Sequence, residues 1–259
     1  MILDWLVINM LGADTLLFTK KGFKKLIELD IYDEVLTPYG VFEPIVKLGP
    51  WKPMDKVIKL NTLEDICCTD NLMLNAADHC NGSYTYVDEV DDKNYYFDPI
   101  MEFEGDGKNH PVSNGYDFAV VVPTCIPDAY ILSPIEERLK LFAGLVDSPI
   151  CELGKVDGIY NFYTYYDDLM QGIVTLCRSL GFGVTCSKKK VVYKIGVSVN
   201  KYIDIIPIKD ELKMCHNYAT MSKRAYVSKV AENKNFTLGR EVKVNGGFFL
   251  VGYSMVPVA

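Results

Sequence analysis

Residues with β-strand character occupy both ends of this chain, and its two clear helices lie between them. Short apolar stretches separated by glycine and proline fill residues 14–75, and residues 218–259 return to the same pattern. Such closely spaced short strands favour an antiparallel sheet or sandwich over parallel βαβ units. Neither end holds enough apolar side chains for a core of its own. We therefore expect the two ends to close into one β domain, with an α/β module inserted between them.

Residues 134–146 are the clearest predicted helix. Ser133 is placed to cap it, and Pro134 suits its first turn. Three- and four-residue spacing puts a set of apolar side chains on one buried face: Ile135, Leu139, Phe142 and Val146. Ala143 and Gly144 leave a flat patch, so we expect another helix to approach closely there.

A second helix is predicted over residues 167–180, with Gly181 as its terminator. Its inward side chains are Leu169, Ile173, Leu176, Cys177 and Leu180. Two strands then follow around the basic turn Lys188–Lys190, which is typical of a solvated hairpin tip. Near the chain end, Asn245-Gly-Gly247 predicts a tight hairpin between residues 241–244 and 248–253.

The negative charge is concentrated in one segment. The formal net charge is −7, yet residues 78–106 hold nine acidic residues and one lysine, a local balance of −8. A net negative charge argues against a general nucleic-acid binder, because duplex binding depends on basic surface. We interpret the acidic, tyrosine-rich segment 78–106 as a solvated loop or an interaction surface.

The eight cysteines form no Cys-x-x-Cys pair, and the three histidines do not fall at zinc-ligand spacings. A site joining His79-Cys80 to Cys215-His216 stays an alternative. The cysteines are Cys67, Cys68, Cys80, Cys125, Cys151, Cys177, Cys186 and Cys215. We expect reduced thiols. No apolar run reaches membrane-spanning length, and the first residues do not resemble a signal peptide, so we expect a soluble, intracellular protein of the cytoplasm or nucleus.

Five motifs in order resemble those of an intein that carries a homing-endonuclease insertion. Residues 12–22 and 27–36 are similar to the first splicing block and the stretch after it, and residues 68–74 to the block that normally reads Thr-x-x-His. Residues 247–259 are similar to the terminal block. Between them, Arg138–Ser148 resembles the LAGLIDADG helix, and Leu176–Phe182 resembles the arginine-serine-leucine-glycine segment that follows it.

This resemblance implies an α+β fold: a mostly-β Hint-like domain formed by both chain ends, interrupted by an inserted α/β LAGLIDADG-like module. The implied Hint-like domain comprises residues 10–78 and 218–259. Residues 133–217 would form the LAGLIDADG-like module. The acidic, tyrosine-rich residues 79–132 would connect the two.

The residues that such a family needs for splicing are missing. The nucleophile position falls on Met10 or Leu11, and a thioether has no ionisable proton for an acyl shift. The histidine that would polarise the scissile peptide falls on Leu72. The terminal His-Asn pair is replaced by residues 257–259, which read Pro-Val-Ala. The resemblance therefore predicts that splicing is lost.

The nuclease positions are also incomplete. LAGLIDADG nucleases use two such helices, each ending in a carboxylate that holds a divalent metal. Asp147 matches the first, structural acid, but the metal-ligand position is Pro149. Only one copy of the helix is evident, since Gly105-Asp-Gly107 lacks the apolar helix before it. We therefore expect no catalytic, cofactor-binding or metal-binding residues and no cofactor.

These absences favour a non-catalytic, intein-derived protein that acts as a structural or scaffolding part of a larger assembly, such as a virus particle or multisubunit complex. Its partners would be proteins, with residues 78–106 as the contact surface; a nucleic-acid partner is possible, and a membrane is not expected. One alternative is a DNA-binding protein whose groove is lined near Lys188–Lys190 and Lys194.

Two further alternatives remain open. One is a residual metal-dependent nuclease that uses Asp167-Asp168 or the acidic run Asp88–Asp92. For Asp167-Asp168 we favour the simpler interpretation of a charged first helical turn. The other alternative is an unrelated α+β protein whose motifs match by chance.

Overall fold

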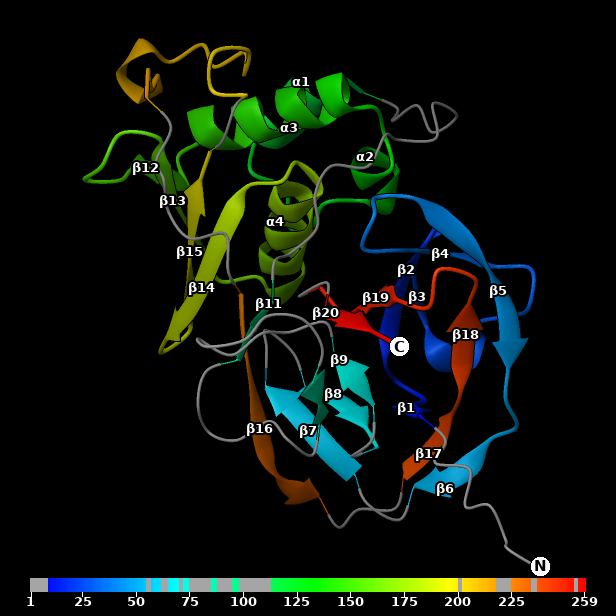
Figure 1. Cartoon of the computed structure of the whole chain (residues 1–259). Helices are drawn as coiled ribbons and strands as arrows, with labels where there is room; N and C mark the ends of the chain where they lie inside the picture. Colours follow the sequence, from blue (N-terminus) through cyan, green and yellow to red (C-terminus); the bar gives the residue numbers. More distant parts are fainter. Residues whose placement is uncertain are drawn as a thin grey trace, which may run out of the picture. The chain divides into compact units, whose positions relative to one another are not determined.

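A computed structural model describes most of the chain. The described residues are 9–54, 57–61, 65–69, 72–74, 85–87, 95–97, 113–199, 202–217, 225–233, 237–253 and 256–259. The chain divides into two compact units (Figure 1). The first unit comprises residues 1–98 and 226–259, and the second comprises residues 99–225.

The first unit contains two sheets built from both chain ends. One has the strand order β11-β16-β7-β8-β1-β17-β6. Its strands are β1 Leu11–Gly12, β6 Lys52–Met54, β7 Val57–Asn61, β8 Asp65–Cys68, β11 Tyr95–Phe97, β16 Ala225–Asn233 and β17 Thr237–Arg240. The other has the order β10-β9-β20-β19-β2-β4-β5-β18, with β3 beside β2. Its strands are β2 Leu16–Thr19, β3 Gly22–Lys25, β4 Glu34–Leu36, β5 Phe42–Leu48, β9 Met73–Leu74, β10 Thr85–Tyr86, β18 Val242–Val244, β19 Phe249–Val251 and β20 Val256–Val258.

Strands from the two chain ends pair directly in both sheets. Leu11 in β1 lies opposite Arg240 in β17, and Leu17 in β2 lies opposite Val251 in β19. The Leu17 and Val251 side chains are fully buried. Early and late strands therefore share one core, as the amphipathic pattern at both ends predicts. The α+β class, with a mostly-β unit interrupted by an inserted module, is confirmed.

The second unit is a four-stranded sheet with helices on one face (Figure 1). Its sheet has the order β12-β13-β15-β14. The strands are β12 Cys151–Leu153, β13 Ile159–Thr164, β14 Gly183–Lys189 and β15 Val192–Ser198. The α-helices are α1 Gly115–Val120, α2 Asp128–Ile131, α3 Ile135–Asp147 and α4 Asp167–Ser179.

Burial alternates along β13, because every second side chain faces the helices. On that inner face the rings of Tyr160 and Phe162 pack edge-on against Phe142 of α3. Phe182 completes this cluster from the end of α4. The other face of the sheet carries the partly exposed side chains of Ile159, Asn161 and Tyr163.

The two long helices agree closely with their predicted bounds, but Ile135, predicted on the buried face of α3, is only partly buried. All five side chains predicted to face inward on α4 are buried, and Gly181 ends that helix with a φ of 69°. The cap of α3 differs from its prediction. Pro134 takes the cap position without a side-chain hydrogen bond, and Ser133 Oγ instead donates to Tyr130 O at 2.6 Å. Ser133 therefore belongs to the preceding turn.

Two predictions in the first unit are wrong in detail. The apolar run Lys25–Asp30 forms a short 3-10 helix at Leu26–Glu28 within the region expected to be β. The turn at Asn245-Gly-Gly247 exists, with Gly247 at a φ of 80°, but its flanking strands do not form a hairpin. Instead β18 pairs with β5, and β19 pairs with β2 and β20. Long-range partners compete successfully with the local pairing.

The range 79–132, expected to be a connecting segment, contains α1 and α2 near its end. Both helices belong to the second unit. Most of residues 78–106, including Asp88–Asp92, lies outside the described residues. Within the described part of the chain, no helix is both long and apolar enough to cross a membrane.

Candidate functional site

The positions that the sequence assigns to a splicing site meet in the first unit. Met10 N donates to Thr69 Oγ1 at 3.0 Å, and Thr69 N donates to Met10 O at 3.0 Å. The last residue lies beside them, since Asn9 Nδ2 donates to Ala259 O at 2.9 Å. Ala259 also exchanges backbone hydrogen bonds with Met73, the residue after Leu72.

The chemical character of this meeting point is apolar. Leu72 is 2% exposed and has no atom that can polarise a carbonyl. Met10 offers a thioether, and Thr69 contributes a hydroxyl that is occupied by the Met10 amide. Thr69 therefore holds the amide of Met10, and Met10 itself offers no hydroxyl or thiol at the nucleophile position.

Asp147, at the end of α3, has both carboxylate oxygens engaged within the second unit. Tyr116 Oη donates to Oδ2 at 2.7 Å, and the backbone amides of Lys209 and Asp210 donate at 2.8 and 3.2 Å. Burial and the hydrogen bond to Asp147 raise the pKa of Tyr116 to about 12, so the phenol stays a donor at neutral pH. Asp147 therefore joins α1, α3 and the segment that contains Lys209.

The residues at this end of α3 do not fit a divalent metal ion. Two residues beyond Asp147, Pro149 offers no side-chain ligand. The carbonyl oxygens of Val146 and Ser148 accept hydrogen bonds from Lys213 Nζ at 2.8 and 2.9 Å. Among the described residues, no group of three or more His, Cys, Asp or Glu side chains is placed to hold a metal ion.

The other acidic candidate, Asp167-Asp168, lies in the first turn of α4. Asp167 Oδ1 is 3.6 Å from Lys188 Nζ, which donates to Tyr193 Oη at 2.5 Å. A hydrogen bond from Tyr193 holds the pKa of Asp167 below its usual value. These contacts agree with the favoured interpretation of a charged first turn. The run Asp88–Asp92 lies outside the described residues.

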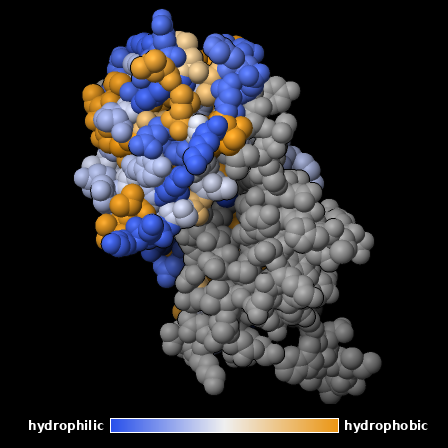
Figure 2. All heavy atoms as spheres, turned by 90° about the vertical axis from the view of Figure 1, so that its left-hand side faces the viewer, coloured by the Kyte–Doolittle hydropathy of each residue, from blue (hydrophilic) through white to orange (hydrophobic). Residues whose placement is uncertain are grey.

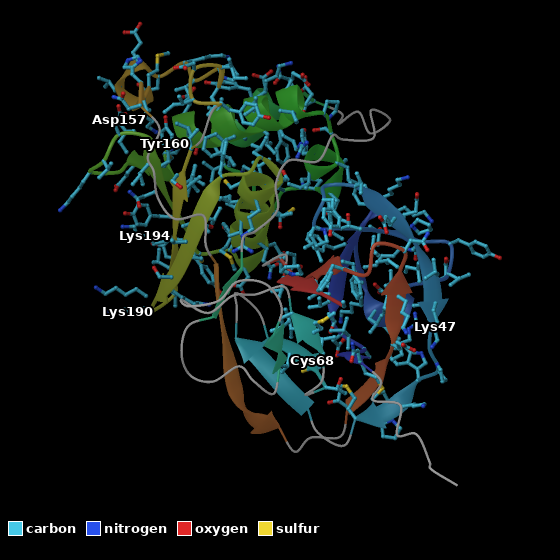
Figure 3. The ribbon with its side chains drawn as sticks, in the orientation of Figure 1. Lys47, Cys68, Asp157, Tyr160, Lys190 and Lys194 are labelled. Atoms are coloured by element: carbon cyan, nitrogen blue, oxygen red, sulfur yellow. The ribbon has the colours of Figure 1, made fainter. Side chains whose placement is uncertain are left out.

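The basic turn divides its lysines between the two faces of the sheet. Lys188 pairs with Tyr193 across β14 and β15 on the helix-covered face, whereas Lys189 pairs with Val192 on the open face. Lys190 sits at the tip with a φ of 57° and extends away from the hairpin (Figure 3). The predicted groove lysines therefore do not form one continuous group.

The open face carries mainly polar side chains in rows across the strands. One row joins Asn161, Gly196 and Thr185, and the next joins Tyr163, Lys194 and Ser187. Figure 2 views the molecule from the side on which this sheet lies in Figure 1, and hydrophilic side chains interrupt hydrophobic ones there. From Leu169 to Ile203 the sequence has six basic residues and no acidic one.

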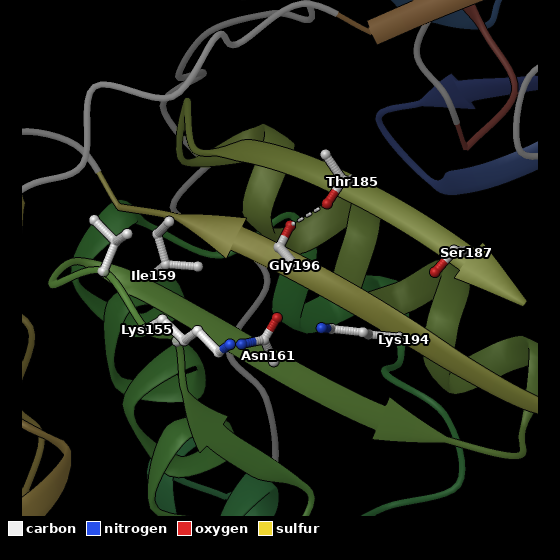
Figure 4. A pocket seen from close by; sticks show the side chains of 9 residues that line it. Lys155, Ile159, Asn161, Thr185, Ser187, Lys194 and Gly196 are labelled. Carbon is white, nitrogen blue, oxygen red and sulfur yellow. Dashed lines mark hydrogen bonds between the residues drawn. The ribbon is translucent and has the colours of Figure 1, made fainter. Parts of the chain in front are cut away.

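A hollow of about 450 Å³ lies on this face. Gly196 provides its floor, because a Cβ there would come within 2.7 Å of Thr185 Oγ1. The lining residues are Gly154, Lys155, Val156, Ile159, Asn161, Thr185, Ser187, Lys194 and Gly196. In Figure 4 the side chains of Lys155 and Lys194 point toward Asn161 from opposite sides. Two cations, an amide and two hydroxyls converge here, and this is the chemistry of phosphate and base-edge contacts.

Sequence reasoning found Lys194 but missed Lys155, Asn161 and Lys213. No spacing pattern links these three residues, because strand pairing and a long-range return of the chain bring them to their places. Of the alternative site joining His79-Cys80 to Cys215-His216, the structure describes only the second pair. Cys215 hydrogen-bonds Asp157 and Tyr160, and burial raises the pKa of its thiol. His79 and Cys80 lie outside the described residues.

In the comparison with protein families, residues 125–233 match the family model described as homing endonuclease. This stretch of the chain is therefore similar to homing endonucleases. The match spans less than half of the chain and includes α3, α4 and all four strands of the second sheet-and-helix unit. The match confirms the resemblance of Arg138–Ser148 to a homing endonuclease.

Two solved structures that resemble the chain are both of the gp41-1 intein. One, a variant with three substitutions, is 11% identical, with 96% of this chain and 97% of that chain covered and a TM-score of 0.34. The other is 10% identical, with 96% of each chain covered and the same TM-score. Among curated proteins, none matches the chain.

Proposed function

We propose that this chain is an intein-derived protein that has lost splicing and DNA cleavage and binds duplex DNA through the open face of its homing-endonuclease-like domain. The observation that carries the proposal is the row of polar and cationic side chains on that face. Lys155, Lys189 and Lys194 supply phosphate contacts, and Asn161 supplies an amide for base edges.

The net charge alone argues against DNA binding, but the charge is unevenly distributed along the chain. The acidic segment 78–106 accounts for the negative balance, so the rest of the chain is close to neutral. A stretch of 35 residues without an acidic side chain contributes β14 and β15, two neighbouring strands of the open face. Local basic surface, rather than the total charge, governs counterion release on DNA.

The test compares Lys189 and Lys194, on the open face, with Lys188, on the helix-covered face. We expect Lys189→Ala and Lys194→Ala each to weaken duplex binding and to reduce the slope of log K against log salt by about 0.9. Lys188→Ala is the matched control, since Tyr193 and Asp167 already hold that ammonium on the covered face. Affinity is measured by fluorescence anisotropy over a salt series. Equal slopes for all three variants, or no binding by the parent protein, would contradict the proposal.

The intein origin is supported by the meeting of Met10, Thr69 and Ala259 in the first unit. In this interpretation the peptide bond before Met10 is still held by the hydrogen bond from Met10 N to Thr69 Oγ1. The nucleophile and the group that polarises the bond are missing. Met10→Cys combined with Leu72→His restores a thiol and an imidazole at those positions.

We expect the double variant to form a thioester at residue 10 that hydroxylamine cleaves, releasing residues 1–9. The parent protein and the single Leu72→His variant serve as controls and should stay intact. The products are identified by mass spectrometry. An intact double variant that keeps the parent's circular dichroism spectrum would count against an intein origin.

A second candidate is a scaffolding role in a larger assembly, favoured by the nine acidic residues and several tyrosines of segment 78–106. Gentle affinity purification from the native source, followed by mass spectrometry, would then yield a stoichiometric protein partner. Deletion of residues 78–106 should abolish its capture. Capture that survives the deletion would exclude this segment as the contact surface.

A further inference from the structure

The carboxyl end of α3 is covered by a segment that returns from far along the chain. We call residues 202–217 the strap. Its apolar side chains Ile203, Ile206 and Ile208 are buried, and a short 3-10 helix, Glu211–Lys213, lies near its end. Asp210 caps that helix by accepting a hydrogen bond from Leu212 N at 3.0 Å.

Several contacts fasten the strap to the end of α3. Asp147 accepts the backbone amides of Lys209 and Asp210. The buried Tyr160 donates to Lys213 O at 3.0 Å. At the far end, Asn217 donates twice to Asp157, at 3.0 and 3.1 Å, beside the labelled Tyr160 in Figure 3. These bonds fix the backbone on both sides of Lys213.

Lys213 is the strap residue whose side chain donates to backbone carbonyls at the end of α3. The last carbonyls of a helix have no partners within the helix and carry the negative end of its dipole. At α3, the Ser148 amide donates to Gly144 O and Leu145 O. The Val146 carbonyl is left over, and Lys213 Nζ donates to it at 2.8 Å and to Ser148 O at 2.9 Å.

We propose that Lys213 is a built-in cation that closes the carboxyl end of α3 in place of a divalent metal ion and holds the strap over that end. The same ammonium supplies the positive charge that the two carbonyls and the helix dipole favour. A metal ion there would have to displace Lys213 and would find Pro149 without a ligand. The proposal concerns this helix end only and holds whether or not the open face binds DNA.

The first experiment measures what Lys213 does for the strap. We expect Lys213→Met to lower Tm by about 5 °C, the size of effect given by losing a charge-assisted hydrogen bond in a domain of this size. It should also speed hydrogen exchange at the amides of Lys209 and Asp210. Lys213→Arg should keep most of the parent's protection. Lys140→Met, on the exposed side of α3, is the control and should change neither quantity.

The second experiment asks whether the lysine excludes a metal. The parent protein and Pro149→Asp alone should bind no Mn²⁺ by electron paramagnetic resonance, because Lys213 occupies the carbonyls. The double variant Pro149→Asp/Lys213→Met should bind about one Mn²⁺ per chain and regain Tm when Mn²⁺ is added. Tight Mn²⁺ binding by the parent that is lost in Asp147→Asn would overturn the proposal. So would a Lys213→Met protein with the Tm and exchange rates of Lys140→Met.

Discussion

Asp33 is a buried carboxylate whose charge is compensated within the first unit. Its side chain is 1% exposed and accepts two hydrogen bonds from Lys24 Nζ, at 2.7 and 2.8 Å. The amide of Asp30 donates a third bond at 3.0 Å. Burial alone would raise the pKa of Asp33, but the bonds from Lys24 and Asp30 outweigh it and hold the pKa below its usual value.

Asp33→Asn is therefore expected to lower the free energy of unfolding by about 2–4 kcal/mol, because Lys24 loses its partner at a buried site. Folding lowers the pKa of Asp33, so its stabilisation is complete above the unfolded value of about 3.9 and is lost as pH falls through the folded value. Urea denaturation between pH 2 and 7 should show a flatter acid limb in the variant. Asp14→Asn, whose partner Lys25 is exposed, is the control and should leave the curve unchanged.

Single residues were predictable where a motif fixes them and not where distant segments meet. Met10 and Leu72 could be paired from sequence, because the motif order assigns both to one site. Lys213 and Asp33 gave no signal, since an isolated lysine or aspartate in a polar stretch is usually solvated. Their roles come from backbone carbonyls and side chains that only the folded chain brings near.

Helix α3 packs closely against α1 at the small residues identified from its sequence. A Cβ on Gly144 would lie 2.4 Å from the carbonyl oxygen of Tyr116 and 2.9 Å from Ala119 Cβ. A Cβ on Gly115 would lie 2.9 Å from the Glu137 carbonyl. The flat patch predicted at Ala143 and Gly144 is thus confirmed, with α1 as the approaching helix.

Gly144→Ala should destabilise the second unit by about 1–3 kcal/mol, even though alanine gains about 1 kcal/mol in helix propensity. The backbone of Tyr116 must move, which also disturbs its hydrogen bond to Asp147. Thermal denaturation followed by circular dichroism measures the change. Glu136→Ala, on the exposed side of α3, is the control. A rise in Tm for Gly144→Ala would contradict this prediction, because it would show that α1 shifts to accommodate the methyl group without destabilising the unit.

Helices and strands were predictable where nearby residues in the sequence determine them. The ends of α3 and α4 follow from nearby proline, acidic and glycine residues, so their predicted bounds were nearly right. The hairpin expected around Asn245 did not form, because β18 pairs with the distant β5, whereas β19 pairs with the distant β2 and with β20, the next strand along the chain. Helices α1 and α2 have six and four residues, too few to show helical periodicity.

At the scale of the whole chain, charge separates the two candidate functions. Residues 78–106 carry the net negative charge, with nine acidic residues and one lysine, while the open face of the second unit carries Lys155, Lys189 and Lys194. Like charges on one molecule repel a polyanion over about one Debye length, near 8 Å at physiological salt. The acidic segment should therefore weaken DNA binding at low salt and have little effect at high salt.

Replacing Asp88, Glu89, Asp91 and Asp92 by their amides raises the formal net charge of −7 by four. If the chain binds DNA, affinity at low salt should rise several-fold in this variant, and the gain should vanish as salt screens the charges. If the chain is a scaffold, the same variant should lose its protein partner and gain no DNA affinity. A control with four substitutions of serine and asparagine outside the segment keeps the charge constant. Anisotropy titrations and affinity capture on the parent and this variant thus decide between the two functions. DNA binding predicts a gain in DNA affinity when the four charges are removed, and the scaffolding role predicts the loss of the protein partner.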